Sequence, residues 1–229
     1  MLDLKEIWNR DTNWEKDKEV PLSIPEYTGG VNPGDQRALY HIFDYLDVKN
    51  VLEIGTHIGC STVSIALALK QKNCVRQDNA RMTTVDIVDV NTFDGCPKDL
   101  LKKAGCLDIV SFEVNDSVKH MSRKIDRWYD CIFLDGDHSY EKVYEELPVA
   151  YDKVEDGGYI LFHDYFPDYK PLWESSKNVL EGPFRAVSQL IREGLEIEVQ
   201  PFGELPSHWK TKFPNECNSS LAIARRPAR

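Results

Sequence analysis

The sequence predicts an α/β protein with a doubly wound, seven-stranded, mostly parallel sheet and helices on both faces. Short apolar segments alternate with segments of helical periodicity, as in consecutive β-α-β units. The first five apolar segments are continuously hydrophobic, which is typical of strands covered on both faces. The last two follow each other without a helical pattern between them. We therefore expect these two to pair antiparallel at one edge of the sheet.

Apolar residues spaced by three and four predict the helices. The first helix has Asp35 as its predicted N-cap, and its apolar face is Leu39, Ile42, Phe43 and Leu46. The same spacing predicts helices at 61–70, 99–105, 141–154 and 183–194. We expect Pro148 to kink or divide the helix at 141–154, because proline cannot donate the helical hydrogen bond.

Runs of aliphatic and aromatic residues that stop at glycine or acidic residues predict the strands. In chain order these are 50–55, 82–87, 109–114, 129–135, 157–164, 195–202 and 219–226. Residues 1–34 are polar and contain three prolines, so we interpret them as an N-terminal cap or lid segment. Residues 35–229 then form a single domain.

Charge and composition exclude several classes of function. The net charge of −10 argues against non-specific nucleic-acid binding, which requires a basic surface. No apolar run is long enough for a membrane span, and the first residues do not resemble a secretory signal. The six cysteines form no C-x-x-C pair, so we expect a reduced, cytoplasmic protein without a cysteine zinc site.

Polar residues follow each of the first five predicted strands. They are Glu53 to Gly55, Asp86, Asn115 to Ser117, Asp135 to His138, and His163 with Asp164. In an open parallel sheet, ligands bind beyond the carboxyl ends of the strands. One such ending is unremarkable, but five at one edge predict a ligand site.

The segment "VLEIGTHIGCST" at 51–62 has the glycines of a tight turn between a strand and a helix. It is not a P-loop, because Cys60 stands where the lysine is required. It is not a dinucleotide fingerprint either, since position 53 is Glu53. A carboxylate there suits a ligand with positive charge, although a glycine turn that only packs the helix remains an alternative. Asp86, at the end of the next strand, can accept both hydroxyls of a ribose.

These segments together resemble a known family. "VLEIGTHIGCST" and the acid at the next strand end are similar to the first motifs of class I S-adenosylmethionine-dependent methyltransferases, which are Rossmann-like. "FLDGDHSYEKV" and "GGYILFHDY" resemble the metal-dependent O-methyltransferases of catechol, of caffeoyl-coenzyme A and of bacterial sugars. The resemblance runs from about Gly30 to the last strand.

The resemblance implies a role for each motif residue. The cofactor S-adenosylmethionine would contact Glu53, Gly55, His57, Ser61, Asp86, Asp116, Ser117 and Asp135. Of these, Asp86 holds the ribose, and Asp116 and Ser117 flank the adenine. A divalent metal, Mg²⁺ or Mn²⁺, would be held by Asp135, His163 and Asp164. His138 matches the general base, which takes the proton of the acceptor hydroxyl.

The sequence departs from the family at His163, where an acid is usual. An imidazole favours Mn²⁺, Fe²⁺ or Zn²⁺ over Mg²⁺, or it hydrogen-bonds a neighbour or the substrate instead of binding metal. The expected acceptor is a small-molecule hydroxyl of a sugar, phenol or polyketide. Alternatives are a metal-independent methyltransferase acting on N or C, and a non-catalytic cofactor-binding module. A homo-oligomer is compatible with the sequence.

Overall fold

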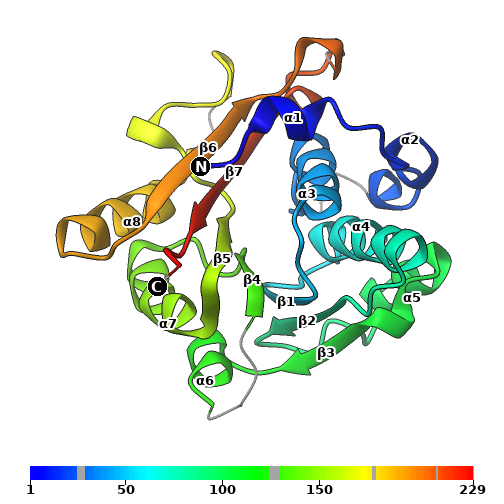
Figure 1. The fold of residues 1–229 in the computed structure, drawn as a ribbon, viewed down its shortest axis with the longest axis horizontal. Coiled ribbons are helices and arrows are strands. Elements are labelled where there is room, and N and C mark those ends of the chain that lie inside the picture. Colours follow the sequence, from blue (N-terminus) through cyan, green and yellow to red (C-terminus); the bar gives the residue numbers. More distant parts are fainter. Residues whose placement is uncertain (25–28, 124–128, 177–178, 210, 229) are drawn as a thin grey trace.

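The computed structural model describes residues 1–24, 29–123, 129–176, 179–209 and 211–228. Seven strands form one sheet in the order β3-β2-β1-β4-β5-β7-β6 (Figure 1). Their bounds are Asn50–Ile54 (β1), Arg81–Asp86 (β2), Val110–Val114 (β3), Tyr129–Leu134 (β4), Val154–Phe162 (β5), Glu198–Glu204 (β6) and Asn218–Arg225 (β7). The predicted fold class is confirmed.

The first five strands pair in parallel, and the last strand reverses direction. β7 lies between β5 and β6 and is antiparallel to both, so the antiparallel pair at the edge is confirmed. The parallel register aligns Ile54 of β1, Leu134 of β4 and Phe162 of β5 in one row. The residues that follow these three strands therefore emerge side by side at the carboxyl edge.

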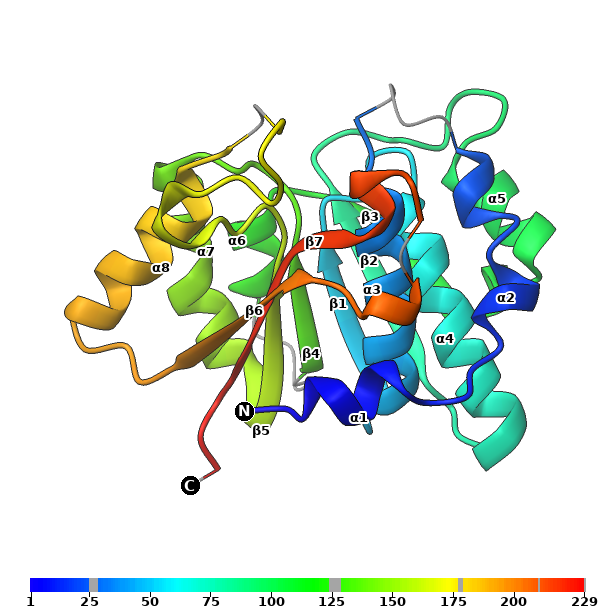
Figure 2. The same ribbon diagram turned by 90° about the horizontal axis from the view of Figure 1, so that it is seen from above.

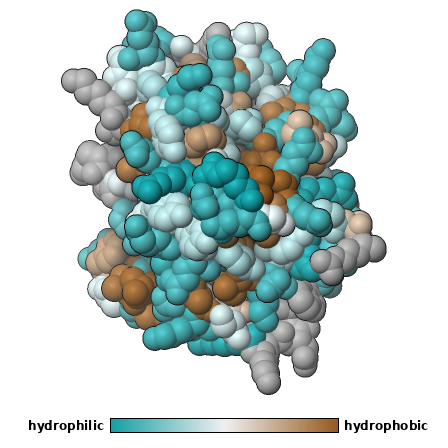
Figure 3. Space-filling view, turned by 90° about the vertical axis from the view of Figure 1, so that its left-hand side faces the viewer, coloured by the Kyte–Doolittle hydropathy of each residue, from teal (hydrophilic) through white to brown (hydrophobic). Residues whose placement is uncertain are grey.

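Helices cover both faces of the sheet (Figure 2). One face carries α3 (Pro33–Tyr45), α4 (Cys60–Arg76) and α5 (Pro97–Ala104), and the other carries α7 (Tyr140–Lys153) and α8 (Gly182–Arg192). Each helix layer buries its aliphatic residues in a separate hydrophobic cluster against the sheet. The surface on the side of α8 is mainly hydrophilic, and its hydrophobic residues form small separate patches (Figure 3).

Several boundaries differ from the predicted ones. α3 begins at Pro33, and its N-cap is Asn32, whose side chain accepts the N–H of Asp35. Asp35 is therefore not the cap, and its side chain is fully buried. Pro148 does not divide α7, which runs through it. A short helix, α6 (Ser117–Met121), was not predicted because five residues hold too little periodicity.

The N-terminal segment packs into the core beside α3. It forms α1 (Leu4–Trp8), α2 (Trp14–Asp17) and a 3-10 turn at Pro21–Ser23, while residues 25–28 lie outside the described part. Trp8 and Trp14 are buried in the same cluster as α3. This packing anchors the segment, and its role as a cap or lid stays a prediction.

Among the described residues, no helix combines the length and hydrophobicity that crossing a bilayer requires.

Candidate active site

A cleft of about 740 Å³ opens at the carboxyl edge of the sheet. Backbone hydrogen bonds hold its floor together: Asp135 N–H donates to Ile54, and His163 N–H donates to Leu134. The predicted site residues that line the cleft are Gly55, His57, Ser61, Asp135, His138, His163 and Asp164. Strand order alone therefore brings together residues that are more than 100 positions apart in the chain.

The loop after β1 crosses directly beneath the end of β4. Gly55 has a φ of +95°, and a Cβ there would lie 2.0 Å from the carbonyl oxygen of Asp135, so only glycine fits. The carboxylate of Asp86 accepts the backbone N–H groups of Thr56 at 3.2 Å and His57 at 2.9 Å. Asp86 does not line the main cleft. It borders a neighbouring cavity of about 150 Å³ that shares Thr56 with it.

Glu53 lies under this loop and is fully buried. Its Oε2 accepts the hydroxyls of Thr62 and Thr84, each at 2.6 Å. Its Oε1 is buried without a hydrogen-bond partner among the described residues. Burial raises the pKa of Glu53 to about 7, against the opposing effect of nearby hydroxyl groups.

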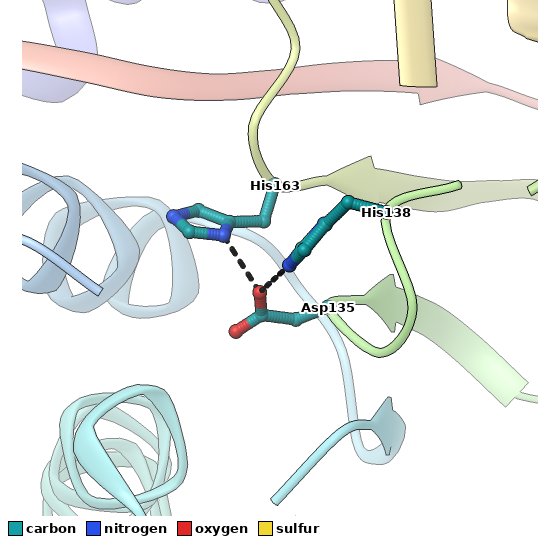
Figure 4. A group of neighbouring side chains, drawn as sticks. All are labelled: Asp135, His138 and His163. Atoms are coloured by element: carbon teal, nitrogen blue, oxygen red, sulfur yellow. Dashed lines mark ion pairs between the residues drawn. The ribbon is translucent and has the colours of Figure 1, made fainter. Parts of the chain in front are cut away.

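Two carboxylates contact the two ring nitrogens of His163. Nε2 lies 3.2 Å from Oδ2 of Asp35. Nδ1 lies 2.7 Å from Oδ1 of Asp135, the contact drawn in Figure 4. The second contact is short but lacks hydrogen-bond geometry, so the buried Nδ1 has no hydrogen-bond partner among the described residues. Burial lowers the pKa of His163, but the charges of Asp135 and Asp164 outweigh it and hold this pKa well above its usual value.

His138 and Asp164 complete the group. Nε2 of His138 lies 3.8 Å from Oδ1 of Asp135 and 3.7 Å from Oδ2 of Asp164. Asp164 adopts a φ of +50°, an uncommon conformation for a residue with a side chain, which is often found at functional sites. Asp137 accepts the backbone N–H of Ser139, as a turn residue does.

This donor set fits a divalent cation. Ligand atoms of Asp135, His138 and His163 all lie within 4.8 Å of one another. Within the described part of the chain, Nδ1 of His163 is buried without a hydrogen-bond partner while Nε2 contacts a carboxylate, which is the usual arrangement of a metal-binding imidazole. An imidazole among carboxylate ligands favours Mn²⁺, Fe²⁺ or Zn²⁺ over Mg²⁺.

The family model of a methyltransferase domain matches residues 52–165, the segment that contains the loop after β1 and the ends of β2, β4 and β5. The chain belongs to this methyltransferase family.

Curated relatives of this methyltransferase are similar at low identity. "Probable caffeoyl-CoA O-methyltransferase 3" of Dictyostelium discoideum is 26% identical over 121 residues, covering 51% of this chain and 44% of that protein. "Tapetum-specific methyltransferase 1" of Arabidopsis thaliana is 26% identical over 171 residues, covering 72% of this chain and 66% of that protein. The chain therefore spans less than two thirds of the length of either relative.

Solved structures share the fold of this methyltransferase over nearly all its length. The O-methyltransferase of Bacillus cereus, in complex with SAH, gives a TM-score of 0.63 at 17% identity, covering 95% of this chain and 91% of that one. The O-methyltransferase TomG of Streptomyces achromogenes, in complex with SAM, gives a TM-score of 0.63 at 15% identity, and the alignment covers 100% of each chain.

Asp116 and Ser117 lie at the end of β3, outside the residues that line the methyltransferase cleft. Asp116 caps α6 and pairs with Lys142 at 3.0 Å, while the buried Ser117 donates to Glu146. Their predicted contact with adenine stays a prediction.

Sequence reasoning missed two parts of the methyltransferase site. Asp35 was expected only as a helix cap, because an acid at a helix start has that appearance whether or not it is buried. The cleft is also lined by residues 29–32 before α3 and by residues between 166 and 180, and neither segment has a motif. Of the aromatic residues in the segments after β4 and β5, Phe166 and Trp173 line the cleft, and Tyr140, Tyr165 and Tyr169 are not among its lining residues.

Proposed function

We propose that the protein is an S-adenosylmethionine-dependent O-methyltransferase that acts on a hydroxyl of a small molecule with the help of a divalent metal. One observation carries the proposal. Asp135, His163 and Asp164 line the same cleft as the glycine loop after β1, and ligand atoms of Asp135, His163 and the neighbouring His138 lie within 4.8 Å of one another. Relatives and structural neighbours described as O-methyltransferases support the same chemistry.

The cofactor would lie across the edge of β1 and β2. Its methionine part would contact Gly55, His57 and Ser61, with Glu53 beneath them. Asp86 would hold the ribose with the oxygen lone pairs that the loop leaves free. The cavity of about 150 Å³ beside Asp86, with Phe112 in its wall, would take the adenine. Structural neighbours in complex with SAH and SAM support a cofactor of this kind.

The acceptor would enter over Asp135. Phe166, Leu172 and Trp173 line the cleft there, so we propose an acceptor whose hydroxyl stands on an apolar or ring-shaped body. Asp135, His163 and Asp164 would hold a divalent cation, and the chemistry it would supply there is a lower pKa for the acceptor hydroxyl. His138 would accept the hydroxyl proton at Nε2, and the charges of Asp135 and Asp164 would stabilise the resulting imidazolium.

The raised pKa of His163 favours one alternative. A protonated His163 beside Asp135 would supply a positive charge without metal, as expected of a metal-independent methyltransferase acting on N or C.

The six cysteines are all free, which supports the proposed reduced, cytoplasmic setting.

Three measurements test the proposal. S-adenosylhomocysteine should raise the melting temperature, and Asp86→Ala should remove that shift. Formation of S-adenosylhomocysteine over a panel of phenols, catechols and sugars should stop with excess chelator and return with added Mn²⁺. No melting shift in the wild type would overturn the cofactor. Binding without turnover would leave a non-catalytic module, and full turnover in chelator would leave a metal-independent enzyme.

A further inference from the structure

Asp35 is a fully buried carboxylate that joins α3, β7 and the candidate metal site. Its Oδ1 accepts the hydroxyl of Ser219 at 2.7 Å and the backbone N–H of Ser220 at 2.8 Å. Its Oδ2 accepts the side-chain amide of Asn32 at 2.6 Å and the hydroxyl of Ser220 at 3.1 Å. The fifth group is Nε2 of His163 at 3.2 Å.

These contacts determine which ring nitrogen of His163 carries a hydrogen. The amide of Asn32 and the backbone N–H of Ser220 can only donate to Asp35, so Asp35 acts as an acceptor. A lone pair on Nε2 would face the negative carboxylate oxygen and repel it. Nε2 must therefore carry the hydrogen, and the lone pair of a neutral His163 then lies on Nδ1.

Nδ1 is the nitrogen that faces the other carboxylates. It lies 2.7 Å from Oδ1 of Asp135 and 3.7 Å from Oδ2 of Asp164. Among the described residues, Nδ1 has no hydrogen-bond partner, so its lone pair is available to a cation held beside Asp135.

We propose that Asp35 is a positioning residue that fixes the tautomer of His163, so that Nδ1 binds the metal together with Asp135 and Asp164. This inference rests on the proposed metal-assisted function. Asp35 also contacts Asn32, which lines the cleft, so the segment before α3 and the metal ligand share one anchor. Outer carboxylates of this kind typically change metal affinity by about 10- to 100-fold when removed.

The decisive variant is Asp35→Asn, which keeps the shape but places an amide donor near Nε2. Titration calorimetry with Mn²⁺ on the cofactor-free protein should show about a 10- to 100-fold loss of affinity. Affinity for S-adenosylhomocysteine should stay unchanged, because Asp35 is not among the residues that line the cleft with the glycine loop after β1. The matched control is Ser219→Ala, which removes one hydrogen bond to Asp35 but leaves Nε2 of His163 paired, and should keep Mn²⁺ affinity near that of wild type.

A second readout does not depend on the folding of any variant. Long-range ¹H–¹⁵N NMR spectra of the Zn²⁺-loaded wild type should show the His163 hydrogen on Nε2 and metal on Nδ1. Hydrogen on Nδ1 would overturn the inference, and so would wild-type Mn²⁺ affinity in Asp35→Asn. A wild type that binds S-adenosylhomocysteine but no metal would instead overturn the metal-assisted function on which the inference rests.

Discussion

Asp86 at the end of β2 accepts a 2.9 Å hydrogen bond from the backbone N–H of His57, in the loop after β1. His57 has a φ of +45°, a conformation that costs a residue with a side chain about 1–2 kcal/mol. The Asp86 carboxylate thus holds the loop in a shape that it would not adopt unaided.

The first prediction follows for Asp86→Asn. The amide keeps one acceptor oxygen but loses the negative charge, so we expect weaker binding of S-adenosylhomocysteine by about 1.5–3 kcal/mol, the usual value of a hydrogen bond to a charged group. Titration calorimetry measures the change. Asp89→Asn, at the same edge of the smaller cavity, is the control. Equal weakening in both variants would show a general charge effect and refute a specific role for Asp86.

The second prediction separates two roles for His138. As a general base, His138→Gln should lower turnover by about 10²- to 10⁴-fold while Mn²⁺ affinity changes little. The control Asp137→Asn keeps the side-chain oxygen that accepts the N–H of Ser139, so it should change turnover and Mn²⁺ affinity little. Loss of Mn²⁺ binding in His138→Gln would instead make His138 a ligand, as its distance from Asp135 permits.

The third prediction concerns the acid that the family usually has at position 163. His163→Asp would set a carboxylate against the buried Asp35, and an uncompensated buried charge typically costs about 3–5 kcal/mol. The double variant with Asp35→Asn should recover most of that stability and prefer Mg²⁺ to Zn²⁺. Urea unfolding of the four proteins gives the coupling energy. Additive effects of the two substitutions would refute the pairing.

The fourth prediction is a pH dependence from Glu53. Its pKa of about 7 in the folded protein lies above the ordinary 4.5, so the folded state holds the extra proton between these values. The contribution of Glu53 to stability is therefore full below about pH 4.5 and falls as the pH rises through 7, by on the order of 3 kcal/mol. Urea unfolding midpoints across this range should fall less steeply in Glu53→Gln. Parallel curves would contradict the burial effect.

The strand ends were predictable from sequence because parallel strands in one sheet must present their carboxyl ends at one edge. Hydrophobic runs located Glu53, Asp135 and His163 at those ends, and the register of β1, β4 and β5 then left no freedom in their arrangement. The resemblance of the glycine loop to methyltransferases added the expected chemistry.

The contacts of Asp35 were not predictable in the same way. They depend on α3 meeting β7 across the sheet, and no local pattern marks a meeting between residues 184 positions apart. The continuity of α7 through Pro148 was not predicted either. Packing of Leu147 and Ala150 in the core outweighs the one backbone hydrogen bond that Pro148 cannot donate, and this packing is not visible in the local sequence. Sequence patterns report local preference, and these features come from tertiary packing.

The link between Asp35 and the two serines of β7 has a consequence for the order of folding. One partner belongs to the first long helix, and Ser219 and Ser220 belong to the last strand. Closing so long a loop is entropically costly and comes late in folding. We therefore expect the imidazole of His163 to gain its fixed orientation only when β7 has joined the sheet.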